Sequence, residues 1–258
     1  MLLFYAPNIA MNQQLPETEA HHCLKVLRMK EGDSLWLTDG KGNFYNAEIA
    51  EINLKRCMVN LLETIPQPPL WKGKIEIALV PTKNIDRIEW FVEKATEIGI
   101  DKISFLRCRF SERKEITTER ILKIMISAMK QSGKARLQVL QEMTGFREFI
   151  GQGFDGQKFI AHCYPDEKKL LAQTYRSNEN ALILIGPEGD FSEDEISLAK
   201  EQGFIPVSLG DSRLRTETAA LTACQTIHVV KQYLSPSPSP QGRGATPLSM
   251  WRGVGGEV

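Results

Sequence analysis

The chain reads Leu184-Ile185-Gly186-Pro187-Glu188-Gly189-Asp190-Phe191-Ser192 where an apolar run ends in a glycine-bearing loop and a helix start follows. The same order returns in Ser208-Leu209-Gly210-Asp211-Ser212-Arg213-Leu214-Arg215-Thr216-Glu217-Thr218-Ala219. Glycine lets a backbone approach a ligand where a Cβ atom would collide. The two loops, taken together, predict a site that wraps a small cofactor with main-chain groups.

Around these loops, apolar runs alternate with helical patterns from about residue 72 onward. Strands are expected at 75–80, 103–106, 159–163, 181–185 and 205–209. Helices are expected at 85–98, 118–131, 166–175, 193–202 and 217–234. Near-continuous apolar strands separated by helices predict an α/β domain with a parallel sheet that is covered on both faces.

The residues before this domain form a different pattern. Short strands at 2–5, 34–38, 45–52 and 57–64, with a helix near 17–27, predict a small β-rich module over residues 1–66. Pro66-Gln67-Pro68-Pro69 stiffens the chain and marks the boundary to a second domain at 72–234. Residues 235–258 are rich in serine, proline and glycine, so we expect a disordered tail.

The global composition is that of an ordinary globular protein. Hydrophobic residues make up 42% and charged residues 25% of the 258 positions. No secretory signal and no run of about 18 apolar residues is evident, so we expect neither secretion nor a membrane span. Five dispersed cysteines suit a reducing compartment, and the four histidines show no metal-ligand spacing. We therefore expect a cytoplasmic protein without a metal.

The charge is zero overall but unevenly distributed, with 32 basic and 32 acidic residues. Residues 107–136 hold nine basic and three acidic side chains, a local excess of nine minus three, or +6. Such a stripe is the electrostatic footprint expected for a phosphate backbone. A solvated helix face without a partner would explain it equally well.

The two loops also carry polar side chains beyond what their turns require. Ser192 and Glu195 predict a capping box, which alone would explain the first loop, but Glu188 lies at the carboxyl end of a buried strand, where open sheets bind ligands. In the second loop, Arg215 could hold a phosphate in a bidentate manner and Glu217 could orient it or accept a proton. The alternative is a structural pair of arginine and glutamate.

The same loops resemble those of the RsmE family, the 16S ribosomal RNA uridine N3-methyltransferases of the SPOUT superfamily. The resemblance rests on Ile185-Gly186-Pro187-Glu188-Gly189, on Leu209-Gly210 and on Leu214-Arg215-Thr216-Glu217-Thr218-Ala219. It continues in His22, Val26-Leu27-Arg28, Gly32-Asp33, Lys94-Ala95-Thr96-Glu97-Ile98-Gly99, Arg109, Ser111 and Gln131-Ser132. These positions follow one another in order over most of residues 1–234.

The resemblance implies an N-terminal PUA-like RNA-binding β-barrel and a C-terminal SPOUT domain with a trefoil knot. It also implies a homodimer that methylates N3 of a uridine in 16S rRNA of the small ribosomal subunit. The cofactor would be S-adenosyl-L-methionine, bound by Ile185, Gly186, Pro187, Glu188, Gly189, Ser208, Leu209, Gly210, Arg213, Leu214, Arg215 and Thr216. RNA would be bound by Arg28, Arg107, Arg109, Arg113, Lys114 and Gln131.

The chemistry of methyl transfer fits these side chains. The enzyme must align the nucleophile with the methyl group and remove the uridine N3 proton. A cation near the uridine oxygens would help the anion form, and Arg215 is our hypothesis for that role. Glu217 or Glu188 would serve as orienter or base.

Other functions remain open at this point. A non-catalytic RNA-binding assembly factor would keep the basic stretch without the cofactor, and a SPOUT methyltransferase could act on another RNA. A doubly wound enzyme would bind NAD or ATP, but the G-x-G-x-x-G match at 151–156 has a helical stretch before it and a strand after it. That order is the reverse of a dinucleotide fingerprint.

Overall fold

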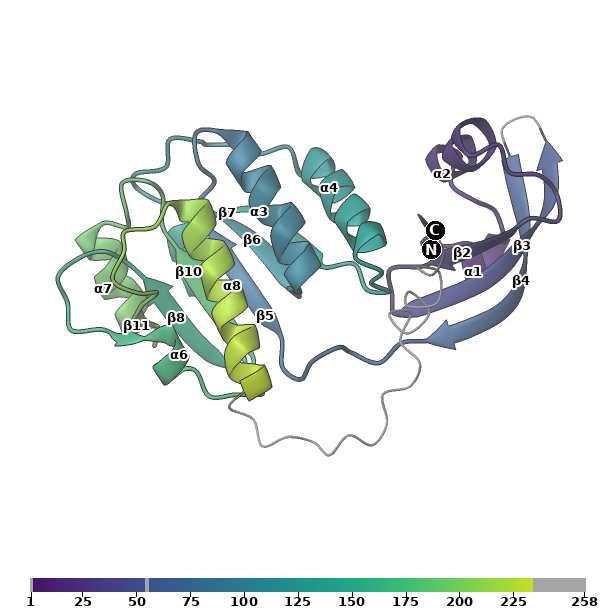
Figure 1. Ribbon diagram of the computed structural model, residues 1–258. Coiled ribbons are helices and arrows are strands. Elements are labelled where there is room, and N and C mark those ends of the chain that lie inside the picture. Colours follow the sequence, from purple (N-terminus) through teal and green to yellow (C-terminus); the bar gives the residue numbers. More distant parts are fainter. Residues whose placement is uncertain (1, 54–55, 234–258) are drawn as a thin grey trace, which may run out of the picture. The chain divides into compact units, whose positions relative to one another are not determined.

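The computed structural model describes residues 2–53 and 56–233, and its contacts divide the chain into two units (Figure 1). The first unit takes in the chain up to Leu70 together with Ile126–Leu137. The second takes in Trp71–Met125 and the described chain from Gln138 onward. The tail expected at 235–258 lies outside the described residues.

The first unit is built on a four-stranded sheet in the order β1-β2-β3-β4. Its strands are β1 (Leu3–Tyr5), β2 (Ser34–Thr38), β3 (Asn43–Asn53) and β4 (Arg56–Pro66). Short helices α1 (Ile9–Asn12) and α2 (Glu17–His21) follow β1, and a π-helical turn continues over His22–Val26. A buried apolar cluster that includes Phe4, Ile9, Leu37 and Ile49 holds the unit together.

The segment 126–137 is the main departure from the expected domain division. The sequence placed it in the second domain, whereas its contacts assign it to the first unit. Three hydrogen bonds explain why: Thr38 Oγ1 and Gly42 N donate to the Ala135 carbonyl, at 3.2 and 2.9 Å, and Leu137 N donates to the Gly40 carbonyl at 2.9 Å. Backbone pairing of this kind leaves no trace in an apolar pattern.

The second unit contains a seven-stranded sheet in the order β7-β6-β5-β10-β8-β11-β9. Its strands are β5 (Ile75–Leu79), β6 (Lys102–Arg107), β7 (Val139–Gly145), β8 (Gln157–Ala161), β9 (Lys169–Leu170), β10 (Ala181–Ile185) and β11 (Ile205–Ser208). Every strand pairs with its neighbours in parallel. This pairing confirms the predicted parallel sheet. All residues of β5 and β10 are buried, as expected for central strands of a sheet that is covered on both faces.

Helices cover both faces of this sheet. The helices of this unit are α3 (Ile85–Ile98), α5 (Phe146–Ile150), α6 (Leu171–Thr174), α7 (Glu193–Glu201) and α8 (Thr216–Tyr233), while α4 (Thr118–Gln131) begins in it and ends in the first unit. On one face α8 packs against α3, α6, β5 and β10 (Figure 1). On the other, α5 and α7 bury Phe149, Ile196 and Ala199 against Leu182 and Leu184 of β10. Side chains of β10 thus alternate between the two layers, as a central strand requires.

One predicted element differs from the structure. The helix expected at 166–175 is instead the short strand β9 followed by α6, because Lys169 and Leu170 pair with β11 and form the edge of the sheet. Strand β7 was not predicted, since it is a polar edge strand that carries Gln141, Glu142 and Thr144 and has no apolar run. Helix α5 corresponds to the helical stretch expected before residue 151.

Lys231 near the end of α8 gives the fold a testable dependence on pH. Its Nζ donates to the Gly73 carbonyl at 3.0 Å, and burial lowers the pKa of this lysine to about 8. An unfolded lysine titrates near its ordinary value of about 10.4, so the unfolded state binds more protons between these values. The free energy of unfolding should therefore gain a contribution from Lys231 as the pH rises through that window.

Urea denaturation across this pH range measures the contribution directly. In Lys231→Met the free energy of unfolding should no longer show the rise with pH that Lys231 contributes. In Lys72→Met, which replaces an exposed lysine, that rise should remain. Identical pH dependence in Lys231→Met and the parent protein would contradict the assignment.

Candidate functional site

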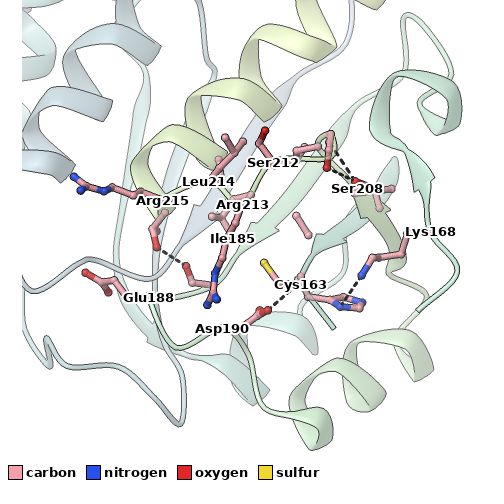
Figure 2. A pocket seen from close by; sticks show the side chains of 18 of the residues that line it. Cys163, Lys168, Ile185, Glu188, Asp190, Ser208, Ser212, Arg213, Leu214 and Arg215 are labelled. Atoms are coloured by element: carbon pink, nitrogen blue, oxygen red, sulfur yellow. Dashed lines mark hydrogen bonds between the residues drawn. The ribbon is translucent and has the colours of Figure 1, made fainter. Parts of the chain in front are cut away.

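A cavity of about 630 Å³ opens at the carboxyl ends of β8, β10 and β11 (Figure 2). Three loops and the first turns of α8 line it, in agreement with the rule that open parallel sheets bind ligands at this edge. We call it the loop cavity. Its volume lies within the roughly 300–1,000 Å³ typical of small-molecule sites.

The first loop leaves the central strand β10 at Gly186 and is tightly held. A Cβ atom on Gly186 would lie 3.1 Å from the ring of Phe191, so a larger residue has no room there. Asp190, at φ 65°, accepts hydrogen bonds from Cys163 N at 2.6 Å and Phe191 N at 2.7 Å. The loop is thereby tied to the end of β8. The predicted capping box of Ser192 and Glu195 then starts α7 and is confirmed.

The second loop is closed by a hydrogen bond between its backbone and its own Ser208 side chain, and a further bond joins it to the first loop. Gly210 has φ +132°, a conformation that favours glycine, and no atom lies within 4 Å of its would-be Cβ. Ser208 Oγ accepts from Gly210 N at 3.2 Å. Thr216 Oγ1 donates to the Gly186 carbonyl at 3.0 Å, and this bond is buried. One hydroxyl thus connects the two loops that the sequence singled out.

The loop cavity gathers the predicted cofactor residues with one exception. The residues that line it are Ile185, Gly186, Pro187, Glu188, Ser208, Leu209, Gly210, Arg213, Leu214, Arg215 and Thr216. Gly189 does not line it, because it faces the side chain of Phe110 instead. The cavity also includes residues that were not predicted, chiefly Ala161, His162, Cys163 and Lys168 after β8. The expected strand 159–163 ends at the same edge, which was the signal available for them.

His162 adds a polar wall to the loop cavity. Its side chain is fully buried, and its Nδ1 lies 3.4 Å from Lys168 Nζ, which also donates to the Tyr164 carbonyl. Burial, followed by the charge of Lys168, lowers the pKa of His162. The imidazole is therefore neutral at physiological pH, and Lys168 carries the positive charge of this wall.

The three predicted catalytic residues lie in two different settings. Arg215 and Glu188 are exposed at the rim of the loop cavity, and Figure 2 shows Arg215 pointing away from its middle. Glu217 is buried, does not line the cavity, and lies 3.8 Å from Arg87 Nε of α3. The structural pairing of arginine and glutamate considered for this loop is thus present, but its arginine is Arg87.

The predicted RNA-binding residues are similarly divided. Arg107 and Arg109 line a second cavity of about 500 Å³, and Lys114 is exposed. Arg113 is already engaged, because its guanidinium donates to the carbonyls of Thr82 at 3.1 Å and Lys83 at 2.7 Å. Its side chain is therefore a structural tie. Arg28 and Gln131 are exposed residues of the first unit.

The described part of the chain has no helix that is both long and apolar enough to cross a membrane. Within residues 2–53 and 56–233, no group of three or more histidine, cysteine, aspartate or glutamate side chains could hold a metal ion.

Family models match both units of the chain. An RNA methyltransferase domain model matches residues 69–228, and an RNA methyltransferase PUA domain model matches residues 15–62. Among curated proteins, the chain is 27% identical to ribosomal RNA small subunit methyltransferase E of Rickettsia conorii. That alignment covers 90% of this chain and 96% of the relative.

Solved structures agree over the same length. A probable rRNA-methyltransferase from Porphyromonas gingivalis is 44% identical, with a TM-score of 0.85 over 90% of this chain and 99% of that one. Ribosomal RNA small subunit methyltransferase E from Neisseria gonorrhoeae, bound to S-adenosyl methionine, is 27% identical with a TM-score of 0.76. The coverage there is 89% of this chain and 98% of that one.

The hydroxyl of Thr216 provides the test of how the loops are joined. Thr216→Val keeps the shape but leaves the buried Gly186 carbonyl without this donor, which should cost about 1–2 kcal/mol of unfolding free energy in urea denaturation. Thr218→Val, two residues along α8, should stay within about 0.5 kcal/mol of the parent. Equal stability of the two variants would show that the bond does not join the loops.

Proposed function

The chain belongs to the RsmE family of RNA methyltransferases, and we propose that it transfers a methyl group from S-adenosylmethionine to N3 of a uridine in 16S rRNA. The observation that carries the proposal is the single cavity formed where two glycine loops meet at the carboxyl edge of the sheet. Two of the relatives named above are ribosomal RNA small subunit methyltransferases E, and one of these two is bound to S-adenosyl methionine.

The residues present fit this cofactor. Gly210 leaves open space beside a backbone that no side chain covers, and the cavity has room for a nucleoside joined to an amino acid. We propose that the cofactor residues named above hold it, largely through main-chain groups, and that Lys168 and Arg213 balance the carboxylates at Glu188, Asp190 and Asp211. When bound, S-adenosylmethionine supplies an electrophilic methyl group on a positively charged sulfonium.

The rim residues would act on the incoming base. Uridine N3 is a weak acid, so its proton must be removed as the new N–C bond forms. We propose that the exposed guanidinium of Arg215 stabilises negative charge on a uridine oxygen and that Glu188 accepts the N3 proton. Glu217, buried against Arg87, would act as a positioning residue that fixes the first turn of α8.

Three wider features complete the proposal. After β10 the chain forms α7 on one face of the sheet and returns past Gly186 to begin α8 on the other, a crossing consistent with a trefoil knot. Trp90 of α3 and Val229 of α8 expose apolar surface on that face, which supports a homodimer. A substrate in the small ribosomal subunit suits a cytoplasmic enzyme.

The position of the methyl group is tested by mass spectrometry of 16S rRNA nucleosides from cells with and without the gene. Loss of the gene should remove N3-methyluridine from the small subunit, and the purified protein with S-adenosylmethionine should restore it. Methylation of another base or of large-subunit rRNA would contradict the proposed substrate.

Arg215 tests the catalytic assignment. Arg215→Ala should lower the turnover of methyl transfer to unmodified small subunits by about a hundredfold or more, as when one oxyanion donor is removed. Because cofactor contacts are proposed to be largely main-chain, the Kd for S-adenosylmethionine should change by less than about threefold, roughly 0.6 kcal/mol.

Arg176→Ala is the matched control, since this exposed arginine does not line the loop cavity and its backbone N donates to Gln157 at the start of β8, the end of that strand away from the cavity. Unchanged turnover in Arg215→Ala, with parent-like turnover in Arg176→Ala, would remove Arg215 from the mechanism.

A further inference from the structure

The loop that follows β6 is held in one conformation and presents two side chains outward. Cys108 N donates to Ser111 Oγ at 2.8 Å, and Ser111 N donates to the Cys108 carbonyl at 3.2 Å. Arg109 N donates to Glu195 Oε1 at 2.8 Å, which ties the loop to the capping box of α7. Arg109 and Phe110 at the tip are both exposed.

Phe110 is an exposed aromatic side chain next to the loop cavity. It keeps 45% of its surface exposed although it is large and apolar. Its Cβ lies 3.5 Å from the would-be Cβ of Gly189, the neighbour of the rim residue Glu188. The guanidinium of Arg109 lies 5.6 Å from the centre of its ring. The ring therefore lies between the rim of the loop cavity and an arginine.

That arginine belongs to the second cavity, of about 500 Å³, which we call the arginine cavity. Arg107, Arg109 and Arg147 line it, together with the carboxylates of Glu148, Asp194 and Glu195. Glu195 is engaged by the capping box, and Asp194 lies 3.6 Å from Arg109 with both side chains well exposed. In the described chain, the side chains of Arg107 and Arg147 form no hydrogen bond or ion pair, so their guanidinium groups are available to an anion.

Together these features have the composition of a single-stranded RNA surface. Proteins bind unpaired strands by holding phosphates with arginine and lysine and by stacking bases on aromatic side chains. A base inside a duplex is already stacked on its neighbours and cannot use such a ring. Because three hydrogen bonds already hold the loop in one conformation, fixing it on RNA binding costs little conformational entropy.

We propose that the arginine cavity and Phe110 form the docking surface for an unpaired stretch of the substrate RNA. One backbone phosphate binds between Arg107 and Arg147, and a neighbouring base stacks on Phe110, which brings the next nucleotide to Glu188 at the rim. The proposal rests on the proposed function, since it assigns how RNA reaches that site. Arg147, which no sequence pattern marked, is one of its phosphate ligands.

The test measures fluorescence anisotropy of the full chain, saturated with S-adenosylmethionine, and a short fluorescein-labelled single-stranded oligouridylate. Arg107→Ala and Arg147→Ala should each weaken binding and reduce the slope of log affinity against log salt by about 1. Phe110→Ala should weaken binding about tenfold without changing that slope, and Phe110→Tyr should restore it. Arg176→Ala should match the parent.

Two controls separate this inference from the proposed function. Titration with S-adenosylmethionine should give the parent Kd for every variant, which also shows that each is folded. Failure of the parent to bind the cofactor or to methylate small subunits would count against the proposed function. The docking surface is wrong if the parent binds the cofactor and methylates small subunits while the docking variants bind RNA normally. In that case Arg107→Ala and Arg147→Ala would bind RNA as Arg176→Ala does, and Phe110→Ala would bind it as the parent does. Equal binding of a duplex probe, unaffected by Phe110→Ala, would overturn the stacking role.

Discussion

The hydrogen bond from Thr216 Oγ1 to the Gly186 carbonyl is the contact on which the rest of the site depends. It joins two segments 30 residues apart, one at the end of the central strand and one at the start of the last helix. A buried carbonyl left without a donor is costly, so this bond favours the arrangement in which both loops face one cavity. The protein thus builds the loop cavity from backbone geometry and one hydroxyl.

The parallel sheet supplies the rigidity that this arrangement needs. Strand β10 is buried along its whole length between β5 and β8, so the loop that follows Ile185 starts from a fixed position. Asp190 ties that loop to β8, and Glu195 ties the loop after β6 to α7. The groups that we propose meet a methyl donor and an RNA base are therefore placed by strands and caps rather than by flexible side chains, which favours preorganised catalysis.

The sequence predicted the parallel sheet, most helices and the meeting of the two glycine loops, because apolar periodicity and turn residues report on them directly. It did not reveal β7, whose polar residues lie at a sheet edge, or the contacts of segment 126–137, which rest on hydrogen bonds to backbone carbonyls and on the ion pair of Lys130 with Glu19. The sequence did not indicate that Arg87 of a distant helix lies beside Glu217. Arg147 was missed for the same reason: only the fold brings it to Arg107.

Amide hydrogen exchange with and without S-adenosylmethionine tests most directly whether the two loops act as one site. The amides of Gly186, Glu188 and Asp190 and those of residues 208–216 surround the same cavity, so both segments should become protected together and with the same dependence on cofactor concentration. Protection of one segment alone, or of neither while the protein stays folded, would contradict the central claim.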